Sequence, residues 1–114
     1  MFPTTVADVF RGILPDDVAT LDGQQAGERL RTVRACRGWL DAYEVSLTQH
    51  VGRLNAAGAS APAADLHARY GGVSSKEARQ KERRARALEA APSMQDKLAA
   101  GDVTAAHADA LADG

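Results

Sequence analysis

The sequence predicts an all-α protein in which a long N-terminal helix is followed by a helix-turn-helix-like bundle of short helices. Three observations support this fold class. Alternating runs of Val, Ile, Thr and aromatic residues, which are typical of strands, are nearly absent. Much of the apolar content is alanine and only 4% of the residues are aromatic, so the core must rest on Leu, Val and close Ala contacts. A heptad pattern also runs through much of the first half of the chain.

The first predicted element is a short helix near the N-terminus. Thr4 or Thr5 supplies its cap, and it extends through Ile13 until Pro15 ends it. The opening stretch "MFPTTVADVFRGIL" has no basic start followed by a long apolar run, so we expect no signal peptide. No segment approaches the length of a membrane span, and we expect a cytoplasmic protein that does not associate with membranes.

A long helix is predicted to start after Asp22 and to reach about Ala57, a length of roughly 50 Å. Seven of its residues are spaced alternately by three and four positions, which defines a heptad stripe. This stripe consists of Val33, Cys36, Leu40, Tyr43, Leu47, His50 and Leu54. A stripe this long needs a partner, which is either the same helix of a second chain or a downstream helix folded back. The sequence leaves both options open, a homodimer among them.

The stretch "NAAGASAPAADL" interrupts the helical pattern and separates two predicted regions, residues 1–58 and residues 59–114. Gly58 is a predicted C-cap of the long helix. Ser60 is a predicted N-cap, with Pro62 in the first turn of a short helix that ends at Tyr70.

The next predicted helix follows the turn "GGVS". Ser74 and Glu77 have the Ser-x-x-Glu spacing of a capping box, in which each side chain satisfies a backbone N–H group. The helix should continue to about Ala90 and stop before Pro92.

Two short pieces complete the chain. Ser93 and Asp96 repeat the capping spacing for a helix that Gly101 ends, and Thr104 starts a final helix. That final helix stops abruptly at Gly114, so we expect the C-terminal unit to be truncated there.

Positive charge is concentrated in one segment of an otherwise acidic chain. Residues 69–86 contain seven basic and two acidic side chains, a net charge of +5. The whole chain carries −1, so the remaining residues sum to −6. Such a distribution indicates one surface that faces a polyanion, although a solvated helix face would show the same composition.

A short helix, a tight glycine-containing turn and a second helix with a basic face together form a helix-turn-helix pattern. Here these are residues 62–70, the turn "GGVS" and residues 75–90. In such a unit the second helix enters the DNA major groove, its first turns meet base edges and basic side chains contact phosphates. The residues predicted to contact DNA are Ser75, Lys76, Arg79, Gln80, Arg83, Arg84 and Arg86. Those predicted to face the protein are Ala78, Ala85 and Leu88.

From Ala61 onward the chain resembles the actinobacterial domain of unknown function 222, which usually precedes an HNH endonuclease domain. The resemblance is carried by "LHARYGGVSSKEARQKERRARALEAAP" and by "LAAGDVTAAHADAL". The order of a Leu-Pro-like break, a short helix, a glycine and a Ser/Thr-x-x-His-Ala helix is also similar to ParB-type partition proteins. The resemblance implies a DNA-binding accessory domain of an HNH-endonuclease-family protein, associated with mobile elements and with double-stranded DNA as partner.

The paired histidines and the asparagine of an HNH module do not occur before Gly114. We therefore expect no catalytic site within these 114 residues. His50, His67 and His107 lie on separate helical segments without the i, i+4 spacing of a helical zinc site, so no metal is predicted. Cys36 is the single cysteine and is expected to pack on the heptad stripe. No cofactor and no small-molecule substrate are predicted.

The alternative function is a helical dimerisation or protein-interaction module with no nucleic-acid binding. In that case the heptad stripe carries the function and the basic helix is solvated surface. The two alternatives differ in what they require, because a DNA-binding module needs its arginines and must lose affinity steeply with salt.

Overall fold

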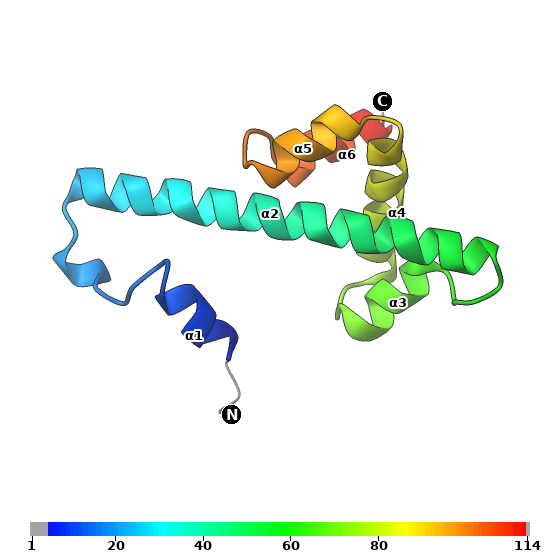
Figure 1. Cartoon of the computed structure of the whole chain (residues 1–114), viewed down its shortest axis with the longest axis horizontal. Coiled ribbons are helices and arrows are strands. Elements are labelled where there is room, and N and C mark those ends of the chain that lie inside the picture. The colour runs from blue at the N-terminus through cyan, green and yellow to red at the C-terminus, as the bar shows by residue number, and fades with distance from the viewer. Residues whose placement is uncertain (1–4, 114) are drawn as a thin grey trace.

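The computed structural model of the chain describes residues 5–113, and within that range every regular element is a helix (Figure 1). In chain order the elements are α1 (Val6–Arg11), the 3-10 turn η1 (Val18–Thr20), α2 (Gly23–Ala56), α3 (Ala63–Tyr70), α4 (Ser75–Glu89), α5 (Pro92–Ala99) and α6 (Ala105–Asp113). The all-α class and the long N-terminal helix are confirmed. Thr4, one of the two predicted caps, and Gly114 lie outside the described residues.

Side-chain caps determine where the first two helices begin. The Thr5 hydroxyl accepts a hydrogen bond from the Asp8 amide at 3.1 Å, and the Asp8 carboxylate accepts one from the Thr5 amide at 3.2 Å. Asp22 and Gln25 make the same reciprocal pair at the start of α2, at 2.8 and 3.0 Å. Each pair satisfies two backbone N–H groups that the helix cannot satisfy itself. α1 ends at Arg11, slightly earlier than predicted.

Gly58 terminates α2 as predicted. Its φ of +76° is in the left-handed region that favours glycine. The Ala59 amide donates to the Leu54 carbonyl at 2.8 Å, and the Gly58 amide donates to the Asn55 carbonyl at 3.0 Å. This pair of bonds is the Schellman arrangement, which satisfies carbonyl groups left over at the end of the helix.

The starts of α3 and α5 are set by prolines, and the serine caps predicted for them are wrong. Pro62 is the residue before α3, while the Ser60 hydroxyl donates to the Ala61 carbonyl and caps nothing. Pro92 is the first residue of α5, and Ser93 lies inside that helix without a capping bond. Proline fixes a helix-compatible φ and lacks the N–H group that would need a partner, so it can start a helix without a side-chain cap.

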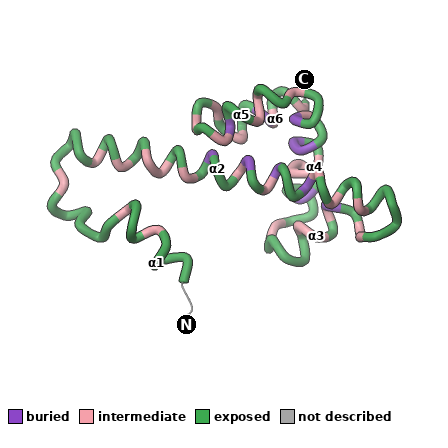
Figure 2. Tube along the Cα trace, viewed as in Figure 1, coloured by how far each residue is buried: buried purple, intermediate pink, exposed green. Residues whose placement is uncertain are grey.

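The core lies where the second half of α2 meets the helices that follow it. Gly38, Ala42, Val45 and Thr48 are the buried residues of α2 and recur at helical spacing along one face. They meet a set of buried side chains from the later helices, namely Ala85, Leu88, Leu98 and Ala108. Figure 2 shows that burial is concentrated in this region and is absent from the first turns of α2.

A pair of glycines brings α2 and the end of α5 into backbone contact. A Cβ atom on Gly38 would lie 2.4 Å from the Leu98 carbonyl oxygen and 3.0 Å from the Gly101 Cα. Gly101 has a φ of +80°, and a Cβ there would lie 3.1 Å from the Ala35 Cα. The turn after α5 can therefore pack on α2 only with glycine at both positions.

The molecule is elongated because the first half of α2 extends away from the core. The Cα radius of gyration is 16.6 Å, above the value of about 13 Å expected for a compact domain of this length. Figure 1 shows α3 to α6 gathered around the second half of α2, with α1 set apart from them. Arg29 and Asp17, paired at 2.9 Å, tie the segment before α2 to its first turns. Among the described residues, no helix has the length and apolar character needed to cross a membrane.

Candidate nucleic-acid interface

Two glycines form the tight connection between α3 and α4. A Cβ on Gly71 would lie 2.7 Å from the His67 carbonyl oxygen, and Gly72 has a φ of +66°. Ser74 then caps α4, since its hydroxyl accepts a hydrogen bond from the Glu77 amide at 3.2 Å. This bond is one half of the predicted capping box. The other half, a bond from the Ser74 amide to the Glu77 side chain, is not formed among the described residues.

α3 is held against both α4 and α2. The Glu82 carboxylate accepts a hydrogen bond from the Ala64 amide at 3.1 Å, which anchors the start of α3 to α4. On the α2 side, His67 Nε2 lies 2.8 Å from the Thr48 hydroxyl oxygen. That hydroxyl donates to the Glu44 carbonyl at 2.7 Å, so the histidine is the donor in the other bond. Burial lowers the pKa of His67, which favours its neutral form.

α4 has a buried side and an exposed basic side. Ala78, Ala85 and Leu88 are buried, as predicted. The residues on the opposite side of the helix are exposed, and four of them share one face at helical spacing. This basic face consists of Lys76, Arg79, Arg83 and Arg86.

The charges of the basic face are weakly engaged within the chain. The Arg83 guanidinium lies 3.7 Å from the Asp113 carboxylate, and the Arg86 guanidinium lies 3.8 Å from that of Glu82. Both pairs are long and solvent-exposed, and such pairs contribute little to stability. Lys76 and Arg79 form no ion pair with any residue in the range 5–113. All four cations are therefore available to an anionic partner.

Arg84 has a structural role in place of the predicted DNA contact. Its side chain is only 10% exposed, and its guanidinium donates two hydrogen bonds to the Asp109 carboxylate, at 2.6 and 2.9 Å. The hydrogen bond to Asp109 raises the pKa of Arg84. Burial alone would raise the pKa of Asp109, but the hydrogen bonds from Arg84 outweigh it and lower that pKa. This bidentate pair joins α4 to α6.

The remaining predicted contacts differ in accessibility. Ser75 is exposed in the first turn of α4. Gln80 is half-buried, its carbonyl oxygen accepts a hydrogen bond from Arg83, and within the described residues its amide nitrogen has no hydrogen-bond partner. Lys81 lies half-buried on the packed side of α4, where its ammonium donates to the Glu44 carboxylate at 2.6 Å. Two of the seven basic residues of the charged segment are thus neutralised inside the chain.

The heptad stripe lies on the side of α2 that faces away from the core. Because successive helical residues turn by about 100°, Tyr43 and Leu47 each lie about 160° from the buried Val45. Leu40, Tyr43, Leu47 and His50 are exposed. The other members, Val33, Cys36 and Leu54, are half-buried. Within the described range α3 lies beside Leu47 but does not cover the stripe, and His50 is not packed in the single chain.

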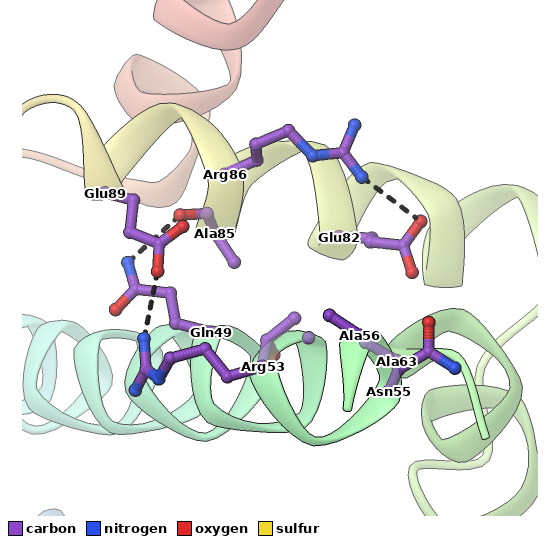
Figure 3. A pocket seen from close by; sticks show the side chains of 11 residues that line it. Gln49, Arg53, Asn55, Ala56, Ala63, Glu82, Ala85, Arg86 and Glu89 are labelled. Carbon is purple, nitrogen blue, oxygen red and sulfur yellow. Dashed lines mark hydrogen bonds and ion pairs between the residues drawn. The ribbon is translucent and has the colours of Figure 1, made fainter. Parts of the chain in front are cut away.

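An open groove of about 320 Å³ between α2 and α4 is lined mainly by polar side chains (Figure 3). Arg53 from α2 pairs with Glu89 from α4 at 3.0 Å. Gln49 Nε2 donates to the Ala85 carbonyl at 3.0 Å and to the Gln95 side chain at 3.1 Å. These side chains are engaged with one another and join α2, α4 and α5. Within residues 5–113 no group of three or more His, Cys, Asp or Glu side chains is placed to hold a metal ion.

Comparison with known proteins gave no match, since no family model, no curated protein and no solved structure is similar to this chain. The resemblance to the domain of unknown function 222 accordingly stays a prediction, and the function rests on the geometry of the molecule itself.

The structure adds residues that the sequence analysis did not single out. Asp109 lies 25 residues after its partner Arg84, and only the fold brings the two together. The Thr104 hydroxyl accepts a bond from the His107 amide at 3.3 Å, and His107 Nδ1 accepts one from the Thr104 amide at 3.2 Å. The Thr-x-x-His spacing is thus a capping box with histidine in place of glutamate, a signal that is readable in the sequence.

Proposed function

We propose that this chain binds double-stranded DNA through the basic face of α4. The observation that carries the proposal is the alignment of Lys76, Arg79, Arg83 and Arg86 along one exposed side of a helix whose opposite side is buried. Four cations in a row at helical spacing match the repeating charge of a phosphate backbone. The acidic character of the remaining chain disfavours binding in other orientations.

The proposed mode has α4 at the major groove, with α3 and the glycine turn behind its N-terminal end. Ser75, Lys76 and Arg79 are nearest to that end and would approach base edges. Arg83 and Arg86 lie further along the helix and would contact phosphates. Arg84, held by Asp109, would keep α4 in place on α6 without contacting DNA.

The wider proposal is that the chain acts as an accessory DNA-binding domain of an HNH-endonuclease-family protein. It draws on the resemblance described above.

The proposal is tested with a fluorescent duplex and fluorescence anisotropy. Each lost phosphate contact weakens binding by about eightfold in 0.1 M salt, so Arg83→Ala combined with Arg86→Ala should raise the Kd by about 60-fold. The matched control is Arg11→Ala combined with Arg31→Ala, which removes the same charge from exposed positions far from α4. Equal losses in the two double variants would show that general charge, and not this face, attracts DNA.

A further inference from the structure

The outward side of α2 carries large apolar side chains that the chain itself leaves uncovered. Trp39, Leu40, Tyr43 and Leu47 are 57, 47, 54 and 49% exposed. The rings of Trp39 and Tyr43 are stacked, with centroids 5.5 Å apart and planes 13° from parallel. Four such residues within three turns form an exposed apolar surface of the kind that marks an interaction site.

The spacing of the apolar residues on this surface indicates that the partner is a helix. From Val33 to Leu54 the heptad stripe alternates steps of three and four residues over about 32 Å. This pattern accepts the side chains of a second helix in knobs-into-holes packing. α3 flanks the stripe beside Leu47 and α5 flanks it beside Tyr43, and between these two helices the exposed side chains stay open to a partner.

We propose that a second copy of this chain covers the stripe, with the two α2 helices antiparallel. The two-fold axis passes midway between Leu40 and Tyr43. Leu40 of each copy then faces Tyr43 of the other, and Cys36 faces Leu47 of the other. These pairs form four apolar layers along the centre of the contact.

The residues that flank the stripe are complementary in this arrangement. Along one edge, Arg37 of each copy meets Glu44 of the other, which gives two opposite-charge pairs related by the two-fold axis. Two turns further along, Leu30 meets Val51 of the other copy, which accounts for an exposed leucine near the start of the helix. Lys81 binds one oxygen of Glu44, at 2.6 Å, and leaves the other oxygen for Arg37.

A parallel, in-register pair lacks this complementarity. It would place Glu44 beside Trp39 of the second copy and Arg37 beside Thr32, so that no opposite charges meet. It would also bring the two Cys36 residues face to face. The charges therefore favour the antiparallel pair, and the cysteine distinguishes the two experimentally.

The inference does not depend on DNA binding, because the basic face of α4 lies outside the contact. The solution mass of the full chain, followed by light scattering over a concentration series, should approach twice the 12.0 kDa of one chain. Leu40→Ser should shift the chain to the monomer. The matched control is Leu111→Ser on α6, which removes a leucine with the same exposure, 47%, from outside the stripe. A monomer at every concentration, or equal effects of the two variants, would overturn the proposal.

Oxidative cross-linking tests the direction of the pair. In the antiparallel arrangement the two Cys36 residues are 11 residues apart along the axis, about 16 Å, which is too far for a disulfide. The unaltered chain should stay uncross-linked, and Leu47→Cys should give a covalent dimer through the native Cys36. Cross-linking of the unaltered chain would indicate a parallel pair and contradict the proposal. Circular dichroism of each variant verifies that it is folded.

Discussion

Arg83 and Arg84 are neighbours in the chain and have opposite environments. The Arg83 side chain is 50% exposed and points to the solvent-facing side of α4, whereas that of Arg84 is 10% exposed and bound to Asp109. The sequence predicted the basic segment but could not separate these two residues, because both are arginines near the edge of the same apolar pattern. The decisive partner lies on α6, and no local spacing connects it to α4.

Arg84→Ala should destabilise the fold. The substitution leaves the Asp109 carboxylate partly buried without its partner, and removing one member of such a pair costs about 2–3 kcal/mol at this degree of burial. The free energy of unfolding is measured by urea denaturation. Arg83→Ala serves as the control and should change it by less than about 0.5 kcal/mol. If the two variants were equally stable, the structural role of Arg84 would be refuted.

Stability should fall as the pH is lowered through the range in which histidine titrates. Burial holds the pKa of His67 below its ordinary value of 6.5, so the unfolded chain binds the proton more readily than the folded one. The contribution is complete above pH 6.5 and is lost as the pH falls below it. Four charged groups act on His67 from α2 and α4, namely Glu44, Lys81, Glu82 and Arg84.

Urea denaturation at pH 7.5 and pH 5.5 measures this dependence. The free energy of unfolding should be lower at pH 5.5, and His67→Gln should reduce the difference. His50→Gln is the control, because His50 is exposed on α2. An identical pH dependence in the unaltered chain and in His67→Gln would exclude His67 as its source.

At the scale of helices, the sequence predicted where α2 begins and ends but not which of its faces packs. The caps were readable because Asp22 and Gly58 act on backbone groups within a few residues. The buried face was missed because Gly38 and Ala42 are small and contribute through close backbone approach. The larger side chains of the heptad stripe drew attention to the opposite face.

Gly38→Ala should separate α2 from the end of α5. The added Cβ would meet the Leu98 carbonyl oxygen at 2.4 Å, and forcing backbone apart in a packed core costs about 1–3 kcal/mol. Gly52→Ala on the same helix is the control, because its Cβ would meet nothing within 4 Å. That change should stabilise the chain by about 0.5–1 kcal/mol, since alanine favours helix over glycine. Thermal unfolding followed by circular dichroism measures both, and destabilisation of similar size in both variants would refute the close contact.

At the scale of the whole molecule, α2 separates two surfaces of different character. Its inner face supports α4, whose basic face is exposed, and its outer face carries the uncovered heptad stripe. The charge asymmetry and the presence of two candidate surfaces were predictable from composition and spacing. Their placement on opposite sides of one helix was not, because it depends on α4 to α6 forming one core with Val45 and its neighbours.

The salt dependence of DNA binding tests the central claim most directly. With two phosphate contacts, from Arg83 and Arg86, the logarithm of the association constant should fall against the logarithm of salt concentration with a slope of about −2. Removing both cations, in Arg83→Ala combined with Arg86→Ala, should make that slope shallower by about 2. The control Arg11→Ala combined with Arg31→Ala should leave it unchanged. No binding at low salt, or a slope unaffected by loss of Arg83 and Arg86, would contradict the assignment of α4 as the DNA-binding helix.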